Sequence, residues 1–485
     1  MSKRVFFLVI FLIFLCSLFL RVYSLSLRPL HHDEGVSWYF FVKKISQGEP
    51  VDFYFEQHGL LPFFLAAIPF RIFGDSIFSL RLAPALFGAF SSFLFFFLAN
   101  EFGYFSCLIA SLLLALSPTM TYYSRFLISY PYFIFFFLVF LIGLLKYLKT
   151  SQKIYLSLSL FALTCLCLIN EAVLIYLLSF LISFLITLPF SQKTRNSFKQ
   201  ILKKTKLSFV FLNLLFCLFF FVLIQTCFFQ NWLNLFKLEL LPKRLLSKSF
   251  QTGHNKPFFY YLKTIISVNF PLLLLFFLAL IISLKNFFQK RKEILPFFFL
   301  FFSLINFLFF SLIKYKTPWV LTLIVFPLII FVGLSLGNFL SQKHSRLVKI
   351  ILSLFLSFSF LWTFLSCLDK NFFTYAEETS QNPLSYVQTK KEVNDLTKEI
   401  DSYAQKNNSE LKILIIAKSY WPLPFYLRNY SLFYLNKPEE LTYSLVKDYN
   451  VVITDKDQKI SFSLDSFKVK EWPLRPGVNL LVLFK

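Results

Sequence analysis

Apolar runs separated by short polar loops fill the first three quarters of the chain. The first run, residues 5–20, follows Lys3 and Arg4 and precedes no small-residue cleavage site, so we interpret it as an uncleaved span. A helix needs about 20 apolar residues to cross a bilayer, and ten further runs approach that length. The pattern therefore predicts about eleven transmembrane helices, at 5–20, 81–99, 105–118, 131–148, 155–169, 172–190, 207–229, 264–284, 294–313, 318–338 and 347–367.

The chain outside these runs shows two other patterns. Apolar residues also fill 60–73, but two prolines and an arginine interrupt them, which favours a helix lying at the membrane interface. Beyond residue 369, a polar helical pattern at 388–405 is followed by apolar strand-like runs at 411–417, 451–454 and 478–484. Apolar strands separated by helical segments are typical of a small α/β domain.

The expected fold class is thus a polytopic α-helical membrane protein with a small C-terminal extracytoplasmic α/β domain. We place the transmembrane domain at 1–369, with a first outer loop at 21–80, and the α/β domain at 370–485. The composition agrees, because 57% of the 485 residues are hydrophobic and only 15% are charged. Soluble domains carry about 25% charged residues, so a soluble enzyme and a disordered chain are both excluded.

Net charge sets the expected orientation in the membrane. The chain carries +24, of which +22 falls within 1–369 and only +2 within 370–485. The basic excess lies in alternate loops between apolar runs, on the side of the N-terminus, which the positive-inside rule makes cytoplasmic. The loop 21–80 and the C-terminal domain are then outside, in the inner or plasma membrane of the cell. A nucleic-acid partner is not expected.

Acidic residues are rare before residue 370, and six of the eleven precede residue 76. Two of them, Asp33 and Glu34, directly follow His31 and His32, and His58 comes later in the same loop. These side chains predict a compact polar cluster at the outer surface of the membrane. The alternative is a solvated loop with incidental charges.

These residues resemble the first outer loop of the GT-C glycosyltransferases. The sequence is most similar to the protein-mannosyltransferase-like group, glycosyltransferase family 39, in its archaeal-type branch described as flippase-activity-associated. The resemblance starts at 31–34 and 58–61 and returns, in the family's order, at 73–76, 81–88, 116–118, 122–126, 316–319, 383–389 and 421–428. It implies a GT-C-like fold and transfer of a hexose or pentose from a polyprenyl-phosphate carrier to a lipid, glycan or protein acceptor on the outer face.

The resemblance also implies roles for single residues. Asp33 would be the general base that takes the proton of the acceptor hydroxyl, and Glu34 would orient Asp33 or the acceptor. Substrate would be bound by three histidines and three basic residues near outer helix ends: His31, His32, His58, Arg81, Arg125 and Lys316. The alternatives are hydrogen bonding within the loop for the histidines and snorkelling to the headgroups for the basic residues. A divalent metal ion stays open, with Asp33 and His58 as candidate ligands.

One stretch departs from the family. A basic residue followed by an acid usually comes shortly after 122–126, but here residues 127–131 read Leu, Ile, Ser, Tyr and Pro. This departure favours a non-catalytic subunit of an envelope glycan assembly complex. The branch's description keeps a flippase for lipid-linked sugar in view, and the first-loop acids with the ordered motifs favour a membrane glycosyltransferase.

Overall fold

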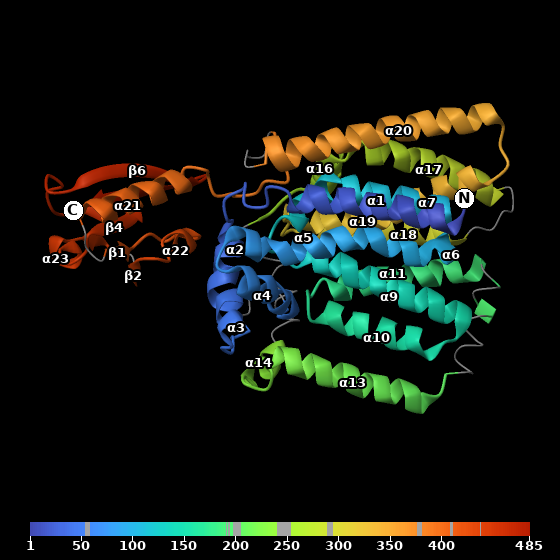
Figure 1. Ribbon diagram of the computed structural model, residues 1–485, viewed down its shortest axis with the longest axis horizontal. Helices are drawn as coiled ribbons and strands as arrows, with labels where there is room; N and C mark the ends of the chain where they lie inside the picture. The colour runs from blue at the N-terminus through green and yellow to red at the C-terminus, as the bar shows by residue number, and fades with distance from the viewer. Residues whose placement is uncertain are drawn as a thin grey trace. The chain divides into compact units, whose positions relative to one another are not determined.

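The computed structural model describes most of the chain. The described residues are 1–53, 59–190, 192, 195–196, 205–239, 254–288, 294–375, 381–407, 411–436 and 438–485. The chain forms two compact units (Figure 1). The helical unit comprises Met1–Leu25 and Gly48–Phe373, and the mixed unit comprises Ser26–Gln47 and Thr374–Lys485. The loop predicted at 21–80 is therefore shared between the two units.

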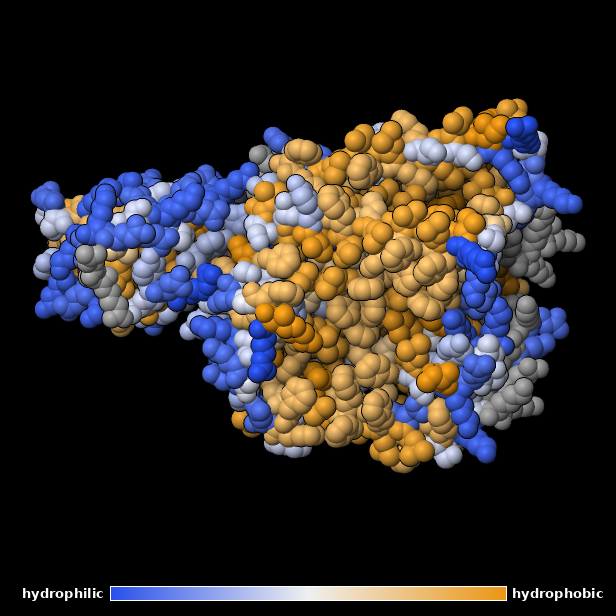
Figure 2. All heavy atoms as spheres, viewed as in Figure 1, coloured by the Kyte–Doolittle hydropathy of each residue, from blue (hydrophilic) through white to orange (hydrophobic). Residues whose placement is uncertain are grey.

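Nine helices in the described part of the helical unit are long and apolar enough to cross a membrane. Figure 2 shows apolar side chains over most of the visible face of this unit. The nine spans are α1 (Lys3–Val22), α5 with η2 and α6 (Ile77–Phe93, Leu94–Leu98, Ala99–Phe102), α9 (Tyr130–Thr150), α11 with η3 (Val173–Thr187, Leu188–Phe190), α13 (Leu207–Gln225), α17 (Phe270–Phe288), α18 (Ile294–Leu312), η5 with α19 (Pro318–Val320, Leu321–Ser341) and α20 with η6 (Arg346–Leu368, Asp369–Phe373).

Two of the eleven predicted spans have a different form. α7 (Tyr104–Leu116) and α8 (Pro118–Ser124) form a pair bent by 57°, because Pro118 has no N–H to continue the ladder of α7. α10 (Lys153–Cys167) is a helix of only 15 residues. The helix expected at 60–73 is present as α4 (Leu61–Phe73), and shorter helices complete the unit: α14 (Leu233–Phe236), η4 (Lys237–Glu239) and α16 (Tyr260–Val268).

The buried helix α19 packs closely on α7. Gly333 and Gly337 are one helical turn apart on α19, and a Cβ at Gly337 would lie 2.3 Å from the backbone nitrogen of Ser106. Small residues at this spacing let two membrane helices approach until their backbones touch. This contact holds the first half of α7 against α19.

The mixed unit contains the predicted α/β domain (Figure 1). Its sheet has the order β2-β1-β4-β7-β6, with β1 (Lys412–Ile415) parallel to β2 (Ser431–Tyr434) and β4 (Val451–Asp455). β7 (Val478–Phe484) runs antiparallel to β4 and to β6 (Lys468–Arg475). Alternate residues of β1 face opposite sides, so α21 (Val393–Asn407) covers Ile413 and Ile415, and Leu414 packs in a second cluster with α23 (Tyr443–Val446).

Short elements complete the mixed unit. β3 (Glu440–Leu441) pairs in parallel with β5 (Lys459–Ile460), and α22 (Leu423–Tyr426) follows β1. The segment from the first loop contributes α2 (His32–Ser37), the π-helix η1 (Trp38–Val42) and α3 (Lys43–Gln47). The candidate acids Asp33 and Glu34 thus begin a helix that packs within the C-terminal domain.

Candidate functional site

The acids of the first loop lie in the first turn of α2, where His31 is the N-cap residue. The Glu34 carboxylate accepts the backbone N–H of His31 at 2.9 Å, and His31 Nδ1 accepts the backbone N–H of Asp33 at 3.1 Å. This reciprocal capping box provides acceptors for backbone N–H groups that have no partner within the helix. Acidic side chains in a first turn are also stabilised by the positive end of the helix dipole. Glu34 is 0% exposed. Its observed role is therefore to hold the turn.

The ring of His31 has both nitrogens engaged. Nε2 lies 2.9 Å from the carbonyl oxygen of Tyr386, which can only accept, so Nε2 carries the proton. Nδ1 then has a lone pair, which accepts from Asp33 as described above. His31 thus uses both ring nitrogens for hydrogen bonds within the mixed unit. This favours a structural role in the loop over a role as phosphate donor or metal ligand.

His32 contacts a residue that the sequence did not single out. Nη1 of Arg475, at the end of β6, lies 2.7 Å from Nδ1 of His32, and Arg475 is only 8% exposed. Burial lowers the pKa of His32 to about 4; Asp33 opposes this shift, and Arg475 and His31 add to it. Burial also lowers the pKa of Arg475, against the attraction of Asp33. His32 is therefore neutral at physiological pH.

Asp33 has a different environment from its neighbour Glu34. Its side chain is 49% exposed, and its closest charged or ring partner among the described residues is Nδ1 of His31, at 3.7 Å. Because Nδ1 of His31 accepts the backbone N–H of Asp33, it presents no proton to the carboxylate, and this contact is no strong ion pair. The two adjacent acids are thus divided between a buried structural group and an accessible carboxylate that can take a proton.

Residues of the two tail motifs at 383–389 and 421–428 hold this loop in place. The side chain of Gln388 donates to the carbonyl oxygen of Pro29 at 2.9 Å, and Tyr426 Oη accepts the backbone N–H of Leu30 at 2.9 Å. A Cβ at Gly35 would lie 2.7 Å from Cβ of Pro422, so only glycine allows this approach. Residues of the tail motifs therefore contact the first loop directly and hold the segment that carries Asp33 and Glu34.

Arg81 and Arg125 lie in the helical unit, where both bond to the end of α1. Arg125 donates to the carbonyl oxygens of Leu20, Arg21, Tyr23 and Ser24 at 2.6–3.3 Å. Arg81 is fully buried and donates to the carbonyl oxygen of Leu25 at 3.2 Å. These contacts favour a structural role, and phosphate binding by either residue stays a prediction.

Lys316 lies between α18 and η5, in a segment that pairs with residues near His254. Its ammonium donates to the carbonyl oxygens of Lys256 and Ile313, at 3.1 and 2.5 Å, and the residue is 2% exposed. Burial lowers the pKa of Lys316. An ammonium has three N–H donors, so one remains beyond these two contacts within the described residues.

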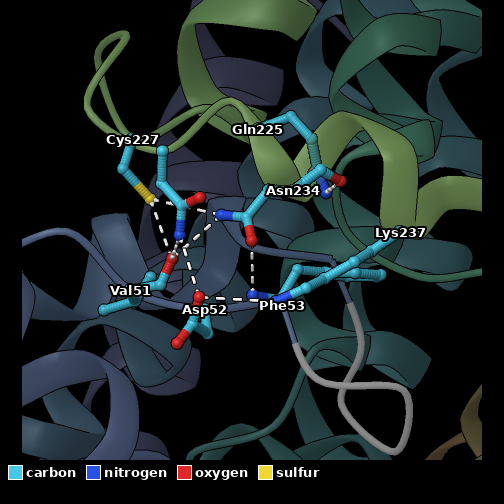
Figure 3. A network of polar contacts seen from close by, with 8 residues as sticks. Val51, Asp52, Phe53, Gln225, Cys227, Asn234 and Lys237 are labelled. Atoms are coloured by element: carbon cyan, nitrogen blue, oxygen red, sulfur yellow. Dashed lines mark hydrogen bonds and ion pairs between the residues drawn. The ribbon is translucent and has the colours of Figure 1, made fainter.

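His58 lies outside the described residues, but the chain on both sides of it is anchored. Asn234 accepts the N–H of Phe53 at 2.7 Å and donates to the carbonyl oxygen of Val51 at 2.9 Å (Figure 3). Asp52 pairs with Lys237 at 3.3 Å. After the gap, Gly59 N–H donates to the carbonyl oxygen of Ile169 at 3.2 Å. No local sequence pattern predicts the contacts of Val51, Asp52 and Phe53, because their partners lie 181–185 positions away.

The described residues contain no group of three or more His, Cys, Asp or Glu side chains placed to hold a metal ion. The candidate pair of Asp33 and His58 is untested by this result, since His58 is not described.

Comparisons with known proteins agree with this architecture. Residues 57–224 match the family described as dolichyl-phosphate-mannose-protein mannosyltransferase. A search of curated proteins found no match. Among solved structures, ArnT from Cupriavidus metallidurans bound to undecaprenyl phosphate is similar, with a TM-score of 0.65, 14% identity and 97% of both chains covered. Its apo state gives 0.64, 13% and again 97% of both chains.

A second, less similar structure has a related fold. The Archaeoglobus fulgidus oligosaccharyltransferase in complex with Zn and sulfate has a TM-score of 0.52 and 15% identity, over 92% of this chain and 68% of the other. Identities this low show the fold alone. The predicted fold class, a polytopic GT-C-like membrane protein with a C-terminal α/β domain, is thereby confirmed.

Proposed function

We propose that this protein is a membrane glycosyltransferase that passes a sugar from a polyprenyl-phosphate carrier to an acceptor, with Asp33 as general base. The observation that carries the proposal is the accessible Asp33 carboxylate on a turn held by a capping box. The family match over 57–224 and the ArnT-like fold support it. The finer assignment to the archaeal-type branch stays a prediction.

The proposed reaction uses the environment of Asp33 directly. An acceptor hydroxyl is a weak nucleophile at neutral pH, so a positioned carboxylate removes its proton as the oxygen bonds to the anomeric carbon of the sugar. The bond from that carbon to the carrier phosphate breaks, and its electron pair leaves with the phosphate. Glu34 contributes by holding the turn, since its carboxylate is already committed to the N–H of His31.

The leaving phosphate needs cationic or N–H partners. Lys316 keeps one N–H donor beyond its two carbonyl contacts within the described residues, and we propose it as the first phosphate ligand to test. The undecaprenyl phosphate bound to ArnT supports a polyprenyl-phosphate carrier. Sugar transfer would take place on the outer face, and we propose no particular sugar or acceptor.

The test is transfer by the purified chain from a panel of radiolabelled polyprenyl-phosphate hexoses and pentoses. Asp33→Asn keeps the shape but removes the base, so we expect a fall of about 100-fold or more. Glu49→Gln, an exposed acid of the same loop, is the matched control and should transfer normally. Unchanged transfer by Asp33→Asn would reject Asp33 as the base.

The absence of the paired charges at 127–131 keeps a non-catalytic subunit in view, and the description of the similar branch as flippase-activity-associated keeps a flippase in view. The same preparation, reconstituted in liposomes, distinguishes them. Movement of the lipid-linked sugar without transfer would favour a flippase, and neither movement nor transfer would favour a non-catalytic subunit.

A further inference from the structure

The C-terminal hairpin brings a buried arginine to the first loop. Arg475 ends β6, just after a register shift at Pro473, and pairs with Val478 across a turn in which Gly477 has a φ of +73°. The preceding Leu474 is buried and accepts the backbone N–H of Lys390 at 2.9 Å. The backbone at Arg475 is therefore fixed on both sides, and its guanidinium is aimed at a residue 443 positions away in the sequence.

The contact determines which nitrogen of His32 carries the proton. A guanidinium has five N–H groups and no acceptor, so the 2.7 Å contact means that Nδ1 of His32 supplies the lone pair. The proton of the neutral ring is then on Nε2. No described residue hydrogen-bonds Nε2, which leaves one N–H donor on the residue that precedes Asp33.

We propose that Arg475 is a positioning residue of the transferase site, which holds His32 with its proton on Nε2 so that this N–H donates to a phosphate oxygen of the substrate. The proposal rests on the function proposed above. In this role the C-terminal domain, through Arg475, orients a substrate-binding side chain in addition to packing against the first loop.

The charged groups around His32 make the proposal testable by pH. They are Asp33 and His31 on its own segment and Arg475 from β6. The elements packed on α2 are η1 and α22, and their only titratable groups are the phenols of Tyr39 and Tyr426. Removing Arg475 takes away a positive neighbour and frees Nδ1, so the ring can flip and can take up a proton at a higher pH than before.

The experiment measures donor KM and kcat of the full-length protein between pH 5 and pH 9. Arg475→Met should lower kcat about tenfold or more at pH 8, as removal of an orienting partner often does. Relative to the wild type, this defect should shrink on the acid side of pH 7, because a protonated ring again carries an N–H on Nε2. Arg475→Gln should recover most of the rate, because its amide N–H can also donate to Nδ1. Lys459→Met, an exposed cation of the same unit, is the control and should behave like wild type.

A double-mutant cycle separates positioning from simple structural support. In a His32→Gln background, Arg475→Met should cost little further activity, and the recovery on the acid side should be absent. An equal loss with and without His32, or an unchanged pH profile in Arg475→Met, would overturn the role of Arg475. Absence of transfer by the wild-type protein would instead overturn the proposed function, and this role with it.

Discussion

Two adjacent histidines of the first loop have different chemical states because of their partners. His31 donates through Nε2 to a carbonyl and accepts through Nδ1, whereas His32 accepts at Nδ1 from a guanidinium. A tautomer is set by the hydrogen bond that the other nitrogen makes. The pair therefore divides into one ring that holds the loop and one ring whose Nε2–H remains for a ligand.

The lowered pKa of His32 predicts how stability depends on pH. An unfolded chain protonates this ring below its ordinary pKa of 6.5, whereas the native state does so only near pH 4. The unfolded state thus binds more protons in this window, so the free energy of unfolding should fall as pH drops from about 6.5 to about 4 and then level off. We expect a thermal unfolding midpoint that falls between pH 7 and pH 5, measured by tryptophan fluorescence in detergent.

The matched variant is His32→Gln, which removes the titrating ring. Its midpoint should fall less between pH 7 and pH 5 than that of the wild type. An equal fall in both proteins would assign the pH dependence to other groups and contradict the neutral state of His32.

At this scale the sequence predicted the candidate acids but not their partners. Asp33 and Glu34 were noticeable because acids are rare before residue 370. Arg475 was not, since it belongs to a domain with balanced charge and its neighbours give no motif. Arg475 and His32 are 443 positions apart in the sequence, so no local pattern predicts their contact and it is seen only in the structure.

The ends of the membrane helices depend on buried arginines. Arg21 of α1 donates to the carbonyl oxygens of Leu114 and Ala115 at the end of α7, both at 3.0 Å, and Arg125 donates to the end of α1. The last carbonyls of a helix have no internal partners and carry the negative end of its dipole. These arginines therefore fix where α1 and α7 stop.

We expect Arg125→Met to destabilise the helical unit rather than only weaken carrier binding. Four carbonyl oxygens would lose their charged donor, at a cost on the order of 3 kcal/mol. The unfolding midpoint and the yield of folded protein should both fall. Lys398→Met, which breaks an exposed pair with Asp395, should change stability by about 1 kcal/mol or less. Normal stability with lost carrier binding in Arg125→Met would instead support the phosphate role.

The apolar pattern predicted the membrane helices well because lipid imposes one simple requirement on them. A span must satisfy its own backbone and be apolar along its length. The bend between α7 and α8 and the short α10 depend on a proline and on packing, which the run lengths do not report. The clearest difference between prediction and structure concerns the segment that contains α2. We expected residues 26–47 to belong to the membrane domain, but they pack with the C-terminal residues.

At the scale of the whole chain, the division into units does not follow the sequence. Residues 26–47 leave the helical unit after α1 and join the mixed unit, and the chain returns at Gly48. The hydrophobic pattern marks only the change near residue 370. The candidate base is thus on a segment whose fold depends on the C-terminal domain, which explains why motifs at both ends of the chain accompany each other.

The charge difference between the two parts of the chain predicts their orientation in the membrane. The excess of +22 within 1–369 lies in loops on the side of the N-terminus, so we expect the N-terminus inside and the C-terminal domain outside. Ser402→Cys on α21 should react with a membrane-impermeant maleimide in intact cells, and Ser2→Cys only after permeabilisation. The unmodified chain is the control for its seven native cysteines, none of which is in a disulfide. Labelling of Ser2→Cys alone in intact cells would reverse the topology and place Asp33 on the side of the membrane opposite to the one proposed for sugar transfer.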